Sequence, residues 1–185
     1  MTCASKPGTT SSVWQCCAAR TTLSTWAATH GPVKTFGTAG VCDTLLVGDA
    51  AVTGAFDVVS SRCHLTRNNV FALAAFEAAY RDGSSWLDEL LASVARNVSV
   101  LERRLPEQIG LVPTEGTYLA WLDLRQLGLD VPEIPRWPAS SAGLALSPGH
   151  WCGREGAGFA RMSIAAPVDI IERAAGQLAA AVARG

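Results

Sequence analysis

The stretch EGTYLAWLD occupies residues 115–123, and the stretch GFARMSIA occupies residues 158–165. The run LALSPG lies between them, at residues 144–149. Each is a short apolar run bounded by Gly or Pro, which is the pattern of strands in a small sheet. We therefore expect these three runs to form the sheet around which the C-terminal half of the chain is built.

Arg161 is the one charged residue in the strand predicted at residues 158–165. A guanidinium in such a strand needs an anion or water beside it, because burying it unpaired is costly. Two interpretations follow. Arg161 forms an ordinary salt bridge within the protein, or its planar fork binds the carboxylate of a ligand. The residue types alone leave both open.

The composition limits the class of protein. The chain has 185 residues, 49% of them apolar and 17% charged, so it can bury the core of one domain, or of one and a half small ones. Its net charge of −1 gives no support for binding to nucleic acid or to an acidic membrane surface. We find no apolar run of the roughly 18 residues that a membrane helix needs, and no signal-peptide pattern. We expect a cytoplasmic protein.

The six cysteines and three histidines do not have the spacing of a metal site. No C-x-x-C pair occurs, and the adjacent Cys16 and Cys17 do not match zinc-ligand spacing. The histidines, His30, His64 and His150, are too scattered to suggest a ligand set. We therefore expect no metal, and free thiols in a reducing compartment.

Helices are predicted on both sides of the sheet in the sequence. After Pro167, apolar residues recur at helical spacing: Ile170, Ile171, Ala174, Ala175, Leu178, Ala181 and Val182. Before the sheet, a helix over residues 85–101 has a longer stripe: Trp86, Leu87, Leu90, Leu91, Val94, Val98 and Leu101. Its opposite face carries Glu89, Arg96 and Asn97 and is expected to be solvated.

Residues 106–113 have the prolines of a boundary. From Ile109 the predicted order is strand, strand, irregular segment, strand, strand, helix. This order predicts a small α+β unit with its helices on one face of the sheet.

Shorter elements are predicted upstream. They are a strand over residues 20–28, a loop over 30–40, a strand over 41–48, a helix over 50–58, a polar turn over 60–69 and a helix over 69–82. Residues 1–30 otherwise lack a persistent period and form a weakly patterned N-terminal segment.

The motifs resemble one group of proteins. The runs PTEGTYLAWLD (residues 113–123), LSPG (146–149) and GAGFARMSIA (156–165) are similar to the C-terminal domain of class I/II pyridoxal-phosphate aminotransferases. The similarity is greatest to their cystathionine β-lyase-like C–S lyase branch, and it spans about residues 31–184.

The resemblance implies an α/β fold: the C-terminal portion of a fold-type I pyridoxal-phosphate-dependent transferase. Residues 31–105 would be a remnant of the cofactor-binding large domain together with the interdomain helix. Residues 106–185 would be the small α+β domain.

The resemblance also implies roles for three residues. Arg161 matches the arginine that binds the α-carboxylate of the substrate, and Tyr118 is a second substrate-binding position. Lys34, in the loop KTFGTAG at residues 34–40, matches the lysine that bonds covalently to pyridoxal 5′-phosphate and later carries the Cα proton. In the family, the large domain with the other cofactor contacts precedes this lysine, so we expect a truncated family member.

The function that the resemblance implies is that of a C–S β-lyase or an aminotransferase, typically a homodimer. Its substrate would be a small amino acid such as cystathionine, and the products of the lyase would be pyruvate, ammonia and a thiol. The alternative is an inactive α+β remnant or a binding module that keeps the small-domain fold. A nucleotide-binding fold is not favoured, because no glycine fingerprint follows a strand and opens a helix.

Overall fold

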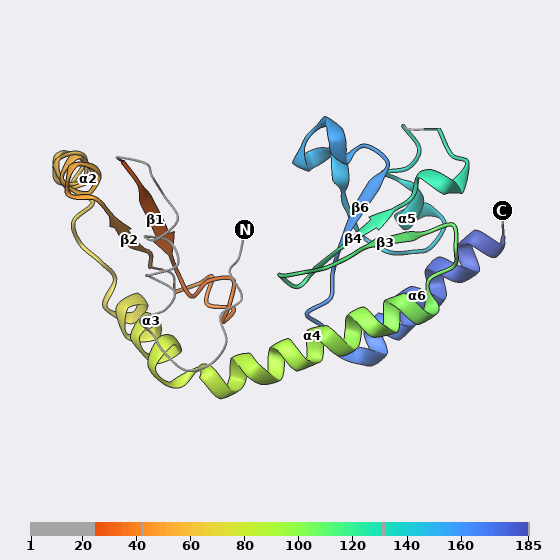
Figure 1. Ribbon diagram of the computed structural model, residues 1–185, viewed down its shortest axis with the longest axis horizontal. Helices are drawn as coiled ribbons and strands as arrows, with labels where there is room; N and C mark the ends of the chain where they lie inside the picture. The colour runs from red at the N-terminus through yellow and green to blue at the C-terminus, as the bar shows by residue number, and fades with distance from the viewer. Residues whose placement is uncertain (1–24, 42, 131, 185) are drawn as a thin grey trace. The chain divides into compact units, whose positions relative to one another are not determined.

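The computed structural model of the protein describes residues 25–41, 43–130 and 132–184, which fall into two compact units (Figure 1). The units divide between Glu89 and Leu90. The segment expected at residues 1–30 and the strand expected at 20–28 lie mostly outside the described residues. The domain boundaries expected at residues 30 and 105 stay predictions.

A four-stranded antiparallel sheet forms the centre of the unit that begins at Leu90 (Figure 1). Its strands are β3 (Gly110–Val112), β4 (Leu119–Asp123), β5 (Ser147–Pro148) and β6 (Phe159–Ser163), in the spatial order β3-β4-β6-β5. The three apolar runs around which we expected a sheet supply β4, β5 and β6. The predicted order of elements is confirmed.

Two helices, α4 (Ser84–Arg104) and α6 (Val168–Ala183), run along one face of this sheet (Figure 1). Side chains alternate between the faces of a strand, so every second residue of β4 and β6 is buried towards the helices: Ala120, Leu122, Ala160 and Met162. Leu122 is fully buried, which stabilises the fold by about 2 kcal/mol. The predicted α+β unit with helices on one face is confirmed.

Helix α4 differs from the prediction on both of its faces. Trp86 and Leu91, which were expected on the apolar face, are 47% and 56% exposed. Asn97, which was expected in solvent, is 1% exposed, so that expectation is wrong. Asn97 is buried because it lies on the same face of the helix as Val94 and Leu101, and this face packs on the sheet.

Short helices interrupt the chain between β4 and β6. They are η1 (Arg125–Leu127), α5 (Trp137–Ser140), η2 (Gly149–Cys152) and η3 (Arg154–Gly156). The backbones of η2 and η3 pass close to each other at Gly149 and Gly156. A Cβ atom on Gly149 would therefore collide with the Gly156 carbonyl and would lie 2.8 Å from the Phe159 carbonyl. Glycine is therefore required at this crossing.

The second unit contains two strands and two complete helices: β1 (Ala27–His30), β2 (Leu45–Gly48), α2 (Ala50–Arg62) and α3 (Val70–Asp82). The helix predicted at 69–82 is confirmed, and Asn69 caps it by accepting from the Phe71 N–H at 2.9 Å. Three boundaries were wrong. Strand β1 reaches into the predicted loop, β2 is shorter than predicted, and α2 continues into the predicted turn.

Asp49 explains where α2 begins. Its carboxylate accepts hydrogen bonds from the backbone N–H groups of Trp26, Ala51 and Val52, at 2.8, 3.0 and 3.1 Å. These bonds, that from Trp26 foremost, hold the pKa of the Asp49 carboxyl below its usual value. One side chain thus caps the helix and joins it to the segment that leads into β1.

Residues 25–89 bury few side chains of their own. The buried residues in this part are Pro32, Ser60 and Ala72. Many large apolar side chains are exposed instead, among them Phe56, Val58, Val59, Leu65, Val70, Phe71 and Leu73. Apolar side chains exposed to water in this number are unfavourable for the unit on its own.

Candidate functional site

Arg161 lies in the middle of β6, on the sheet face opposite the helices, because its neighbours Ala160 and Met162 are buried towards them. Its partners across the strands are Trp121 on β4 and Ser147 on β5. Residues directly opposite each other in antiparallel strands share a face. An indole and a hydroxyl therefore flank the guanidinium.

The Arg161 guanidinium forms no ion pair with any described carboxylate. Nη2 donates to Ser147 Oγ over 3.4 Å, which is long for such a bond. The side chain is half-buried. The first interpretation of Arg161, a salt bridge within the protein, is therefore not seen in the described part of the chain. Its fork is available to a carboxylate.

An aromatic pair lies on the same face of the sheet. The rings of Trp121 and Phe159 are stacked with centroids 5.7 Å apart, and the Arg125 guanidinium lies 4.7 Å from the centroid of Phe159. Arg125 also pairs with the Asp123 carboxylate at 2.7 Å. The hydrogen bond from Arg125 holds the pKa of the Asp123 carboxyl below its usual value. The charge of Arg125 is therefore balanced by Asp123, whereas Arg161 has no carboxylate partner among the described residues.

Tyr118 precedes β4 and is bonded to the end of β6. Its carbonyl accepts from the Ile164 N–H at 2.8 Å, and its side chain packs partly buried on the core. The preceding residue, Thr117, has φ 70°, a left-handed conformation that is rare for a β-branched residue and stores strain. Tyr118 and Arg161 thus lie in the same unit, but the Tyr118 side chain packs on the core side of the sheet, whereas Arg161 lies on the opposite face.

Lys34 belongs to the other unit and is exposed in a turn. The Phe36 N–H donates to the Pro32 carbonyl at 2.8 Å, which closes the turn around Lys34. Pro32 is fully buried, and the ring of Phe36 lies 5.9 Å from that of Tyr80 and 5.7 Å from that of Trp86. Both ends of the turn are therefore fixed while the lysine amine faces solvent.

No family model matches the chain, but comparison with individual proteins finds relatives. Cystathionine β-lyase PatB of Bacillus subtilis is 32% identical over 136 residues, which cover 71% of this chain and 35% of PatB. A pyridoxal-phosphate-bound protein of Clostridium difficile 630, assigned to the aminotransferases, has a TM-score of 0.79 at 31% identity and covers 84% of this chain.

The chain belongs to the family of pyridoxal-phosphate-dependent C–S lyases and aminotransferases. Cystalysin of Treponema denticola, which contains a pyridoxal 5′-phosphate cofactor, superposes with a TM-score of 0.75 at 25% identity over 85% of this chain. The chain spans 35% of PatB and 41% of both solved structures. It is a partial member of the family, and this extent is consistent with a C-terminal part. The resemblance noted in the sequence is confirmed.

Two observations in the second unit fit the family's cofactor. The amine of Lys34 is exposed, and within the described residues it has no ion pair, so it is free to bond to an aldehyde. Thr38 Oγ1, four residues later, is buried without a hydrogen-bond partner. An orphaned buried hydroxyl of this kind needs a group that the described residues do not supply. The family resemblance assigns the remaining cofactor contacts to the part of the relatives that this chain does not span.

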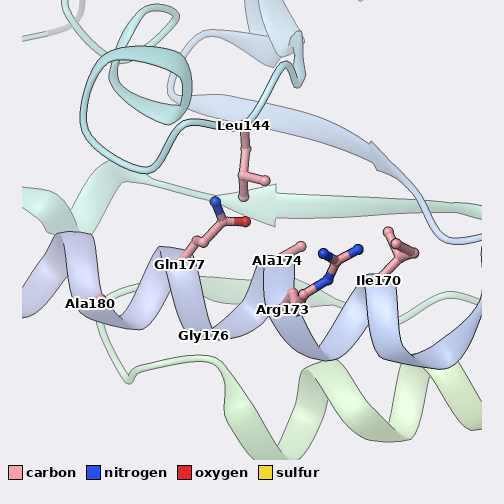
Figure 2. Close-up of a pocket in the computed structure, with 7 residues that line it drawn as sticks. All are labelled: Leu144, Ile170, Arg173, Ala174, Gly176, Gln177 and Ala180. Atoms are coloured by element: carbon pink, nitrogen blue, oxygen red, sulfur yellow. The ribbon is translucent and has the colours of Figure 1, made fainter.

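A separate groove of about 530 Å³ lies along α6, and none of the predicted site residues lines it (Figure 2). Its lining is Leu144, Ile170, Arg173, Ala174, Gly176, Gln177 and Ala180. In Figure 2 the side chains of Arg173 and Gln177 rise from the helix towards Leu144. In the described part of the chain we find no cluster of metal-binding side chains and no helix that is long and apolar enough to cross a membrane.

Proposed function

We propose that this chain carries the carboxylate-binding part of a pyridoxal-phosphate-dependent enzyme that acts on a small amino acid. The half-buried guanidinium of Arg161, which has no carboxylate partner among the described residues, is the observation that supports it most strongly. Two parallel N–H groups bind a carboxylate in a fixed orientation, which aligns the rest of an amino acid with the reacting centre. A contact of Tyr118 with the same substrate stays a prediction from the family resemblance, because its side chain packs on the core and not beside Arg161.

Lys34 would hold the cofactor through a covalent bond and would move the proton at the substrate Cα. When bound, pyridoxal phosphate supplies an electron sink for the carbanion at that atom. In a C–S β-lyase a thiolate then leaves the β-carbon, and in an aminotransferase the proton returns at a different position. The names of the relatives favour the lyase, with cystathionine as the model substrate. A homodimer and a cytoplasmic location stay predictions.

The covalent bond can be tested with the two lysines of the chain, Lys6 and Lys34. Purified protein is mixed with pyridoxal phosphate, its visible spectrum is recorded, and the bond is fixed with borohydride before peptide mapping by mass spectrometry. We expect a yellow protein labelled at Lys34. The label should be lost in Lys34→Ala and kept in Lys6→Ala. Equal labelling of both lysines, or a colourless protein, would contradict the proposed role of Lys34.

The exposed apolar side chains of residues 25–89 are a liability of the non-catalytic alternative. If nothing else covers them, the protein should associate with itself, because apolar side chains exposed to water are unfavourable. Light scattering after size-exclusion chromatography should then give a mass above the 19.4 kDa of one chain.

The matched variants are Leu65→Ser and Phe71→Ser, since both side chains are 72% exposed. They should reduce the measured mass and leave the melting temperature unchanged. A sharp 19.4 kDa peak for the unchanged protein would argue against this account of the apolar side chains.

A further inference from the structure

The backbone of Ile164 connects the end of β6, the start of β4 and helix α4. Its N–H donates to the Tyr118 carbonyl at 2.8 Å, and its carbonyl accepts from Asn97 Nδ2 at 2.8 Å. Ile164 also lies three residues after Arg161 on the same chain segment. Asn97 of α4 therefore holds the backbone of Ile164, which is bonded to Tyr118 and lies at the end of the strand that carries Arg161.

Asn97 satisfies backbone groups that regular structure leaves unpaired. The second N–H of its amide donates to the Ala166 carbonyl at 2.8 Å, so both donors are used. These carbonyls belong to the link between β6 and α6, outside both the strand ladder and the helix. Ile164 is fully buried, so its carbonyl would be costly to leave without a donor.

The Asn97 side chain uses its N–H donors but not its oxygen. Asn97 Oδ1 is buried and has no hydrogen-bond partner within the described residues. A buried acceptor of this kind is unfavourable, and an apolar side chain of similar size would avoid it. A residue with this cost therefore lies on the core side of α4, where the Ile164 and Ala166 carbonyls need donors.

We propose that Asn97 is a positioning residue for the substrate carboxylate. By holding the Ile164 carbonyl to α4, it fixes the end of β6 and so the place of the Arg161 fork that this strand carries. This inference rests on the proposed function of Arg161. It gives an affinity role to a residue that does not touch the substrate, because small displacements of a binding group are costly.

The test compares Asn97→Leu, which removes both donors at similar volume, with Val100→Ala. Val100 lies on the same buried face of α4 and is 4% exposed, but it makes no bond to the link. Two quantities are measured on the full chain after both melting temperatures are known. The first is the affinity for L-cystathionine, obtained from the change in the NMR signal of the Arg161 Nε–H group on titration. The second is the rate of hydrogen exchange at the Ile164 N–H.

We expect Asn97→Leu to weaken L-cystathionine binding about tenfold and to speed Ile164 exchange about tenfold, beyond any change in Val100→Ala. Equal effects in the two variants would overturn the proposal, since they would reduce Asn97 to a contributor to stability. If Asn97→Leu does not fold, Asn97→Ser, which keeps one donor, takes its place against the same control.

The two measurements separate failure of this inference from failure of the proposed function. If the unchanged protein shows no binding that depends on Arg161, the proposed function fails, and with it the role of Asn97 in affinity. If binding is present and Ile164 exchange is the same in Asn97→Leu and Val100→Ala, the positioning role alone fails.

Discussion

Arg161→Ala should lower the affinity for L-cystathionine by about 3 kcal/mol, or about 100-fold. The variant removes a half-buried cation that has no carboxylate partner within the described residues. Little stability should be lost, because Arg161 makes one long hydrogen bond to Ser147. Titration calorimetry gives the affinity, and thermal denaturation confirms that the variant is folded.

Two further variants test whether the fork itself is responsible. Arg161→Lys keeps the charge but loses the parallel N–H groups, so its affinity should lie between that of the unchanged protein and that of Arg161→Ala. Arg173→Ala makes the same change at an exposed arginine of α6 and should bind as the unchanged protein does. Binding that survives in Arg161→Ala would remove the carboxylate role.

Gly149→Ala should destabilise the unit that begins at Leu90 by about 2 to 3 kcal/mol. The new Cβ atom would collide with the Gly156 carbonyl and would lie 2.8 Å from that of Phe159. These are backbone atoms, so relief requires the η2–η3 crossing to open. Since β5 directly precedes Gly149, Ser147 would move away from Arg161. Thermal denaturation should show the loss as a melting temperature of this unit lower by about 8 to 24 °C.

Gly176→Ala is the matched control for this substitution. Gly176 lies inside α6, and a Cβ atom there would meet nothing within 4 Å. Alanine has the higher helix propensity by about 1 kcal/mol, so this variant should melt slightly higher than the unchanged protein. If Gly149→Ala melted equally high, the close crossing of η2 and η3 would not be rigid.

The helices could be predicted from sequence because their apolar residues recur at helical spacing, and the strands because they are short apolar runs bounded by Gly or Pro. The face on which Leu122 is buried was not among these predictions. Asn97 could not be predicted, because a polar residue on a helix is normally solvated and its two partners lie 67 and 69 residues away. Ser147 was also missed, because it lies opposite Arg161 only through the register of β5 on β6, which local sequence does not determine.

Residues 25–89 were harder to predict for a different physical reason. Amphipathic patterns identify a face that a chain buries within itself, and this part buries few side chains of its own. The end of α2 was therefore misjudged. The candidate site shows the same limit: the residue type and its strand pointed to Arg161, whereas Lys34 in its Gly- and Pro-rich loop came from family resemblance alone.

The strand order has a consequence for how the protein can aggregate. The outermost strands, β3 and β5, are three and two residues long, and β5 ends in Pro148, which has no N–H to offer an incoming strand. Continuous edge-to-edge pairing, the route to cross-β fibrils, is therefore blocked on that side and short on the other. Contacts between copies of this unit are therefore expected to be made by side chains and not by an extended backbone ladder.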